Sequence, residues 1–159
     1  MTLALGIDPG TATTGYGLVR LTREGNLVAV KYGVILTPKE SPTPARLELL
    51  YDQLRALLKK YEPETAAVEK LFFQRNVTTA LAVGQARGVV LLALQQAGIE
   101  AFEYTPNEIK QAVAGYGSAQ KKQVQEMVRT LLLLDEIPKP DDAADALAVA
   151  ITHLHTKRY

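Results

Sequence analysis

The chain has 159 residues, of which 47% are hydrophobic and 22% are charged, and its formal net charge is +1. This length and composition fit one globular domain that can bury a core of its own. The absence of cysteine excludes disulfides, thiol catalysis and zinc–thiolate centres. We find no signal peptide at the start and no continuous apolar run near the roughly 20 residues that span a bilayer, so we expect a cytoplasmic protein without a membrane segment.

The first 36 residues predict three β-strands joined by short turns. The apolar runs Leu3–Asp8, Gly15–Leu21 and Leu27–Leu36 are separated by glycine-rich or charged segments, which is typical of an antiparallel meander. Residues 38–44 carry three prolines and are expected to connect this meander to the next element.

An amphipathic helix is predicted after the proline-rich connector. Thr43 is the expected N-cap, with Pro44 at the first helical position. Leucines then recur at helical spacing as far as Tyr61. Pro63 follows and helps to end the helix before a short β-like run, Thr65–Glu69.

The second half of the chain alternates helices and strands. A long helix of about 20 residues is expected to end near Gly98. The run Ile99–Tyr104 predicts the fifth strand, and Thr105 with Glu108 has the spacing of a capping box at the start of a short helix. These elements favour a mixed sheet in which two parallel strands extend the meander, with helices on its faces.

Two further helices are predicted near the C-terminus. Ser118 is expected to cap the first of them, which extends through Leu134, and the second is expected to begin near Asp141. We find no internal repeat and no linker, so a single α/β domain over residues 1–159 is expected.

Four carboxylates stand at strand ends and on one face of the last helix. Asp8 ends the first strand and Glu69 ends the fourth, while Asp142 and Asp145 are three residues apart. If the two strands are neighbours, Asp8 and Glu69 lie side by side at the edge where open α/β sheets bind ligands. Oxygen ligands of this kind suit Mg²⁺. The sequence therefore predicts a metal site, and such sites commonly act on phosphate.

Acidic residues in a first helical turn have a second interpretation, because they also stabilise the helix dipole. Asp141 is the best candidate for this purely structural role, and Asp142 considered alone fits it too. Asp145 fits it less well, since a carboxylate among the apolar neighbours Ala144 and Leu147 needs a cation or a hydrogen-bond donor when it is partly buried.

The turn after the first strand leaves other functions open. The segment Asp8-Pro9-Gly10-Thr11 can shape a phosphate loop, and similar turns occur in actin-like ATP-binding domains. That class needs a second lobe with a second phosphate loop, whereas this chain shows one lobe. A non-catalytic nucleic-acid-binding module is a third possibility, although four carboxylates would hinder the binding of DNA.

Taken together, the motifs of the chain resemble those of RuvC-type crossover junction endodeoxyribonucleases. The resemblance covers nearly the whole chain in order, and it rests on Gly6-Ile7-Asp8-Pro9-Gly10, Gly15-Tyr16-Gly17, Val68-Glu69-Lys70-Leu71-Phe72, Gly84-Gln85-Ala86-Arg87-Gly88, the run from Gly117 to Leu132, and Asp142-Ala143-Ala144-Asp145-Ala146-Leu147-Ala148.

This resemblance implies an RNase H-like fold and a homodimer that resolves four-way Holliday junctions by paired, symmetric nicks. It implies that Asp8, Glu69, Asp142 and Asp145 are the catalytic residues and bind two Mg²⁺ ions, for which Mn²⁺ could substitute. Cleavage by two metal ions would leave 5′-phosphate and 3′-hydroxyl ends. The branch-migration proteins RuvA and RuvB are the partners that the resemblance suggests.

Five further residues are candidates for binding DNA. The resemblance places Phe72 near the junction centre, where it could stack on an unpaired base, and places Lys110 and Lys121 near the scissile phosphate. Arg75 is a candidate phosphate contact. Lys122 is another, because two lysines at a helix start oppose the dipole and favour an anionic partner.

The long helix from Asn76 to Ala97 is the candidate dimer seam. Gly84 and Gly88 would allow a second helix to approach closely, and the helix is apolar around much of its circumference. We also expect surface positions for His153 and His155, which point in different directions on a helix and so do not predict a joint metal site.

Overall fold

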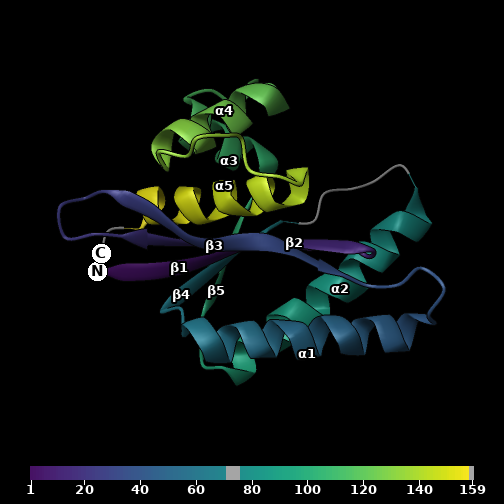
Figure 1. Cartoon of the computed structure of the whole chain (residues 1–159). Helices are drawn as coiled ribbons and strands as arrows, with labels where there is room; N and C mark the ends of the chain where they lie inside the picture. The colour runs from purple at the N-terminus through teal and green to yellow at the C-terminus, as the bar shows by residue number, and fades with distance from the viewer. Residues whose placement is uncertain (71–75, 158–159) are drawn as a thin grey trace.

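The computed structural model describes residues 1–70 and 76–157, which form a five-stranded sheet with helices on both faces (Figure 1). The elements in chain order are β1 (Thr2–Asp8), β2 (Thr13–Leu21), β3 (Leu27–Leu36), α1 (Thr43–Tyr61), β4 (Thr65–Glu69), α2 (Val77–Gln96), β5 (Ala101–Tyr104), α3 (Pro106–Ala114), α4 (Lys121–Leu131) and α5 (Asp141–Thr156).

The strand order in the sheet is β3-β2-β1-β4-β5. Strands β1, β2 and β3 pair antiparallel, whereas β4 pairs parallel with both β1 and β5. The predicted meander extended by two parallel strands is therefore confirmed. In the β1–β4 register Ile7 is opposite Val68, so the last residues of these two strands, Asp8 and Glu69, lie side by side.

Helices cover both faces of the sheet (Figure 1), and each face carries its own apolar core. On one face, the fully buried Leu54 of α1 and Leu94 of α2 belong to the same cluster as Leu5 of the sheet. On the other face, Leu147 of α5 and Val128 of α4 belong to the second cluster. Burying a side chain of this size contributes about 1.5–3 kcal/mol, so α5 is held firmly between the sheet and α3 and α4.

Three glycines allow α5 to lie directly on the sheet. A Cβ atom at Gly6 would stand 2.1 Å from the carbonyl oxygen of Ala146, and one at Gly15 would stand 1.9 Å from that of Asp142. A Cβ at Gly17 would stand 2.7 Å from Leu147 Cδ2. Since no larger residue fits without moving the helix, these glycines fix the depth at which the first turns of α5 meet the ends of β1 and β2.

The predicted capping box at the start of α3 is confirmed. The Thr105 hydroxyl accepts a hydrogen bond from the Glu108 amide at 3.1 Å, and the Glu108 carboxylate accepts one from the Thr105 amide at 3.1 Å. The prediction that Thr43 caps α1 was wrong by one residue. Pro42 is the N-cap and Thr43 is already helical, because the ring of Pro42 fixes its φ near −64°, which suits the extended conformation of an N-cap.

The prediction that Ser118 caps α4 was also wrong. The backbone is still turning there, since the Ala119 amide donates to the Tyr116 carbonyl at 3.3 Å. Gln120 is the N-cap instead, and its backbone N–H donates a hydrogen bond to Gln123 Oε1 at 2.8 Å. The sequence favoured serine because of its capping propensity, but the turn after α3 uses two further residues before α4 can begin.

Helix α2 exposes several large apolar side chains. Its side chains Val77, Leu81 and Leu92 are all more than half exposed. By length and composition α2 could cross a bilayer, since its mean hydropathy is 1.6. The expectation from the sequence considered continuous apolar runs only, and it did not include this helix because Arg87 interrupts the run. Core helices of proteins outside membranes reach the same length and hydropathy. In this structure Arg87 of α2 forms an ion pair with Glu103 of β5, which ties the helix to the sheet.

Candidate active site

Three of the predicted carboxylates converge where β1 ends and α5 begins. Asp8, Asp142 and Asp145 each offer one oxygen atom, and these oxygens all lie within 4.8 Å of one another. All three residues are partly buried. An all-oxygen donor set in a partly enclosed position fits a hard divalent cation such as Mg²⁺.

Glu69 joins this group through Asp8. The two residues follow the paired Ile7 and Val68 on neighbouring parallel strands, and the charge of Glu69 is close enough to raise the pKa of Asp8. Glu69 is therefore adjacent to the other three carboxylates although it is outside their tightest grouping. We refer to Asp8, Glu69, Asp142 and Asp145 as the carboxylate cluster.

The electrostatics of the cluster favour either protons or cations. Burial, followed by the charges of Glu69 and Asp145, raises the pKa of Asp8 from 3.8 to about 9. Burial is also the main cause that raises the pKa of Glu69 and the pKa of Asp145. Carboxyl groups this close resist ionising together, so a bound cation would be the natural way to hold them charged at neutral pH.

A groove of about 530 Å³ opens beside the carboxylate cluster. Its lining includes Glu69 and Asp145 of the cluster together with Lys110 of α3 and Lys121 of α4. The Lys121 ammonium lies 3.7 Å from Asp145 Oδ2 and 3.4 Å from Asp141 Oδ2. The groove therefore places positive side chains next to the carboxylates, as a site for an anionic substrate requires.

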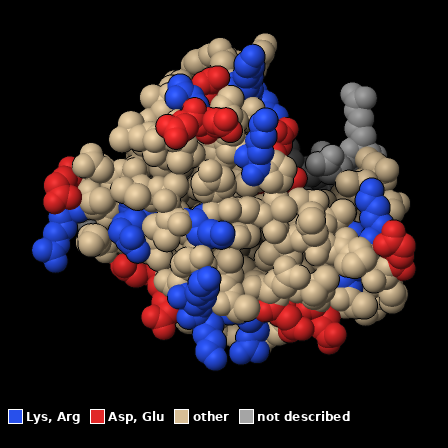
Figure 2. All heavy atoms as spheres, viewed as in Figure 1, with Lys and Arg blue, Asp and Glu red and all other residues tan. Residues whose placement is uncertain are grey.

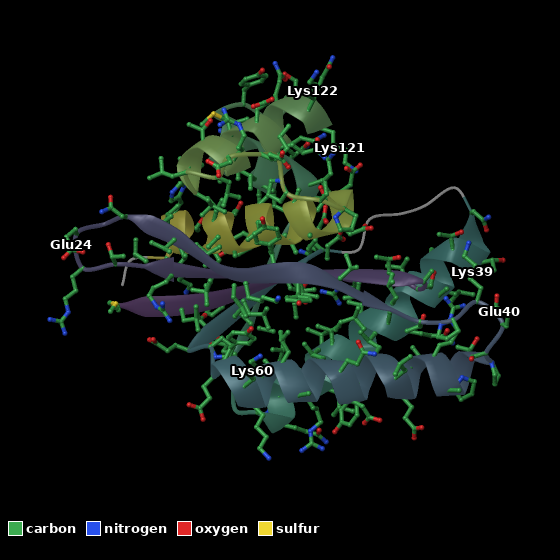
Figure 3. The ribbon with its side chains drawn as sticks, in the orientation of Figure 1. Glu24, Lys39, Glu40, Lys60, Lys121 and Lys122 are labelled. Atoms are coloured by element: carbon green, nitrogen blue, oxygen red, sulfur yellow. The ribbon has the colours of Figure 1, made fainter. Side chains whose placement is uncertain are left out.

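The remaining DNA-binding candidates are placed differently. Lys122 is exposed on α4 and lies farther from α5 than Lys121 does (Figure 3). Phe72 and Arg75 lie outside the residues that the structure describes. The expectation that Asp141 caps α5 was wrong, because Pro140 is the N-cap and Asp141 is the first residue of the helix. The Asp141 carboxylate accepts a hydrogen bond from Gln125 Nε2 at 3.2 Å.

Positive charge does not gather into one patch on the face seen in Figure 2. Lysines and arginines there are interspersed with acidic residues over both helical layers. Long-range attraction of a polyanion to this face would be weak at physiological salt. The local lysines of the groove are therefore the better-supported contacts for phosphate.

His153 is an internal residue, so the prediction of a surface position was wrong. Its side chain is fully buried, with Nε2 2.7 Å from the Thr65 hydroxyl and Nδ1 2.8 Å from the Tyr104 hydroxyl. The Phe102 ring lies against it, with ring centroids 4.7 Å apart. Burial, with a smaller contribution from Lys157, lowers the pKa of His153 from 6.5 to about 4. Its two partners come from β4 and β5, which sequence spacing could not reveal.

Fold and site together define a class of protein. The sheet has this strand order, and carboxylates stand on β1, on β4 and on the last helix. This combination defines an RNase H-like nuclease. Residues 4–153 match the family model described as crossover junction endodeoxyribonuclease RuvC. The chain belongs to this family.

Individual relatives agree with this family. A crossover junction endodeoxyribonuclease RuvC from Desulfitobacterium hafniense is 59% identical over 155 residues, covering 97% of this chain and 93% of the relative. One from Chloroflexus aggregans is 60% identical over 154 residues, covering 96% and 93%. A solved structure titled as T. thermophilus RuvC in complex with Holliday junction substrate has a TM-score of 0.93 and 37% identity, covering 98% of this chain and 94% of that one.

Proposed function

We propose that this protein is a structure-specific endonuclease that resolves four-way Holliday junctions by paired, symmetric nicks during DNA recombination and repair. The observation that carries the proposal is the carboxylate cluster beside a groove lined by Lys110 and Lys121, in a chain of the RuvC family. The similar T. thermophilus structure is titled as a complex with Holliday junction substrate, which supports the same class of substrate here.

The carboxylate cluster would hold the divalent metal of the reaction. Asp8, Asp142 and Asp145 supply converging oxygens, and Glu69 supplies a further carboxylate next to Asp8. Two Mg²⁺ ions, or Mn²⁺ in their place, would supply an activated water and stabilise the leaving oxygen. Hydrolysis of this kind gives 5′-phosphate and 3′-hydroxyl ends that a ligase can join.

The lysines of the groove would act on the phosphate itself. Lys110 and Lys121 carry positive charges within reach of a strand that enters the groove beside Glu69 and Asp145. A cation near the scissile phosphate binds it and neutralises charge that develops on its non-bridging oxygens. Both lysines are therefore assigned to binding and charge stabilisation, whereas the carboxylates hold the metal.

A symmetric pair of nicks requires two active sites, and we infer that the protein acts as a two-fold dimer. Helix α2 offers the surface for this contact. Val77, Leu81 and Leu92 are exposed along it, and a Cβ at Gly88 would meet no atom within 4 Å, so that position is open to a partner helix. RuvA and RuvB as partners, and a cytoplasmic location, are proposals that rest on the family alone.

The alternative functions are less well supported. An actin-like ATP-binding domain would need a second phosphate loop from a second lobe, and the described residues form one sheet with its flanking helices. A non-catalytic DNA-binding module would gain nothing from four carboxylates that repel phosphate.

A comparison of substrates tests the proposal. The purified protein is incubated with a synthetic four-way junction and with a linear duplex of the same arm sequence, each with Mg²⁺ and with EDTA. We expect paired nicks in the junction only, with Mg²⁺ only, and ends that ligate. Equal cutting of both DNAs, or hydrolysis of ATP without cutting, would contradict the proposal.

A further inference from the structure

Lys121 faces two carboxylates of α5, and only one of them belongs to the carboxylate cluster. Asp145 is a member of the cluster, whereas Asp141 is exposed at the start of the helix. Lys121 and Gln125 are four residues apart on α4, and Asp141 and Asp145 are four residues apart on α5, so each pair shares a helix face. The two faces meet at the rim of the groove, where Figure 3 shows Lys121 on the side of α4 nearer α5.

Three contacts connect these four residues in a row. Gln125 Nε2 donates to Asp141 Oδ1 at 3.2 Å, and the other oxygen of Asp141 lies 3.4 Å from Lys121 Nζ. The same ammonium lies 3.7 Å from Asp145 Oδ2. Gln125 thus fixes one oxygen of Asp141 and leaves the other directed at Lys121.

We propose that Asp141 is a positioning residue that holds the Lys121 ammonium at the rim of the groove, with Gln125 orienting Asp141. The proposal rests on the proposed function, in which Asp145 holds a cation and Lys121 acts on the phosphate. A carboxylate that holds a divalent cation has less negative charge to offer an ammonium group. Asp141 lies outside the cluster and remains available to Lys121 when Asp145 is occupied.

The magnitude of the effect is limited by exposure. Lys121 and Asp141 keep 58% and 66% of their side-chain surface exposed, and exposed ion pairs are weak. A change of roughly two- to fivefold in the rate of cleavage is therefore expected when Asp141 loses its charge. A purely structural role is the competing explanation, because an acidic residue in a first turn stabilises its helix whether or not a lysine is near.

A double-mutant cycle separates these explanations. Single-turnover cleavage of a saturating four-way junction is measured for Asp141→Asn, for Lys121→Met and for the double variant, with thermal melting to compare folding. Asp135→Asn is the matched control, since it removes an equal charge from an exposed aspartate in the loop before α5. Gln125→Ala and Asp141→Glu complete the series.

The expected results are specific to the row of contacts. Asp141→Asn slows cleavage two- to fivefold, Gln125→Ala slows it less, and Asp141→Glu restores most of the rate. In the Lys121→Met background Asp141→Asn has no further effect beyond that of Asp135→Asn. An equal loss from Asp141→Asn in both backgrounds, or no loss in the parent protein, would overturn the proposal.

Binding of Mn²⁺ alone gives a second measurement that does not depend on cleavage. Without Asp141 the ammonium spends more time on Asp145, so Mn²⁺ binding followed by electron paramagnetic resonance should weaken in Asp141→Asn. In the Lys121→Met background, Asp141→Asn should weaken Mn²⁺ binding no more than the control substitution Asp135→Asn does. If Mn²⁺ binding follows this pattern but the protein cuts no junction, the proposed function is refuted while the contact between Asp141 and Lys121 is supported. If Asp141→Asn weakens Mn²⁺ binding equally in the parent and in the Lys121→Met background, that contact is overturned.

Discussion

Gly15 of β2 lies against the backbone of Asp142, so closely that a Cβ atom at Gly15 would stand 1.9 Å from the Asp142 carbonyl oxygen. This approach brings the carboxylate-bearing first turn of α5 to the strand that neighbours Asp8. The carboxylate cluster therefore depends on a missing side chain as much as on the acidic side chains themselves.

Gly15→Ala is expected to displace the start of α5 and to separate Asp142 from Asp8. Overpacking of this kind costs about 1–3 kcal/mol, so the midpoint of urea unfolding should fall and junction cleavage should fall more steeply than junction binding. Gly117→Ala is the control, because its added methyl group would meet no atom within 4 Å. Unchanged cleavage by Gly15→Ala would show that the depth of α5 is unimportant.

His153 is expected to make the stability of the protein depend on pH. Its pKa is lowered to about 4 in the folded chain from 6.5, so folding favours the neutral ring. Between pH 4 and pH 6.5 the unfolded chain binds more protons than the folded chain does. The stability that the neutral His153 ring contributes is therefore complete above pH 6.5 and is lost as the pH falls towards 4. The loss is about 3 kcal/mol across the window.

Urea unfolding at a series of pH values from 7 to 4.5 measures this dependence. His153→Gln should be less stable than the parent at pH 7, and this difference in stability should shrink as the pH falls, because the variant has no titrating ring to lose. His155→Gln, which alters an exposed histidine of the same helix, serves as the control. A stability difference between the parent and His153→Gln that stays constant from pH 7 to 4.5 would exclude a titrating role for His153.

Leu133 is expected to be replaceable by glycine with a gain in stability. It follows α4 with a φ of 54°, in the left-handed region, and its side chain is 88% exposed. Glycine adopts this conformation without the penalty that a Cβ brings, so Leu133→Gly should stabilise the fold by up to about 1 kcal/mol. Thermal melting checks this expectation, and Leu133→Ala, which keeps the Cβ, should gain little.

The proposed dimer predicts that a charge on the exposed face of α2 separates the subunits. Leu81→Glu should convert the protein to a monomer in light scattering at micromolar concentration and should reduce paired nicking, because a buried charge without a partner is costly. Val28→Glu alters an exposed apolar residue on β3 and should leave the mass unchanged. A parent protein that is monomeric, both free and on the junction, would contradict the dimer.

The sequence predicted the strand-end carboxylates correctly because strand ends are local features. Asp8 and Glu69 each follow a short apolar run, and parallel strands bring such ends together. The contacts of Asp141 with Gln125 and of His153 with Thr65 could not be predicted in this way. They join residues of different elements, and nothing in helical or strand periodicity shows which faces will meet.

The measurement that tests the central claim most directly compares binding and cleavage of one junction by Asp8→Asn. Loss of this carboxylate from the middle of the cluster should abolish cleavage with Mg²⁺, while junction affinity in a gel shift stays the same or rises because a charge that repels phosphate is gone. Substantial remaining cleavage would show that the carboxylate cluster is not the active site.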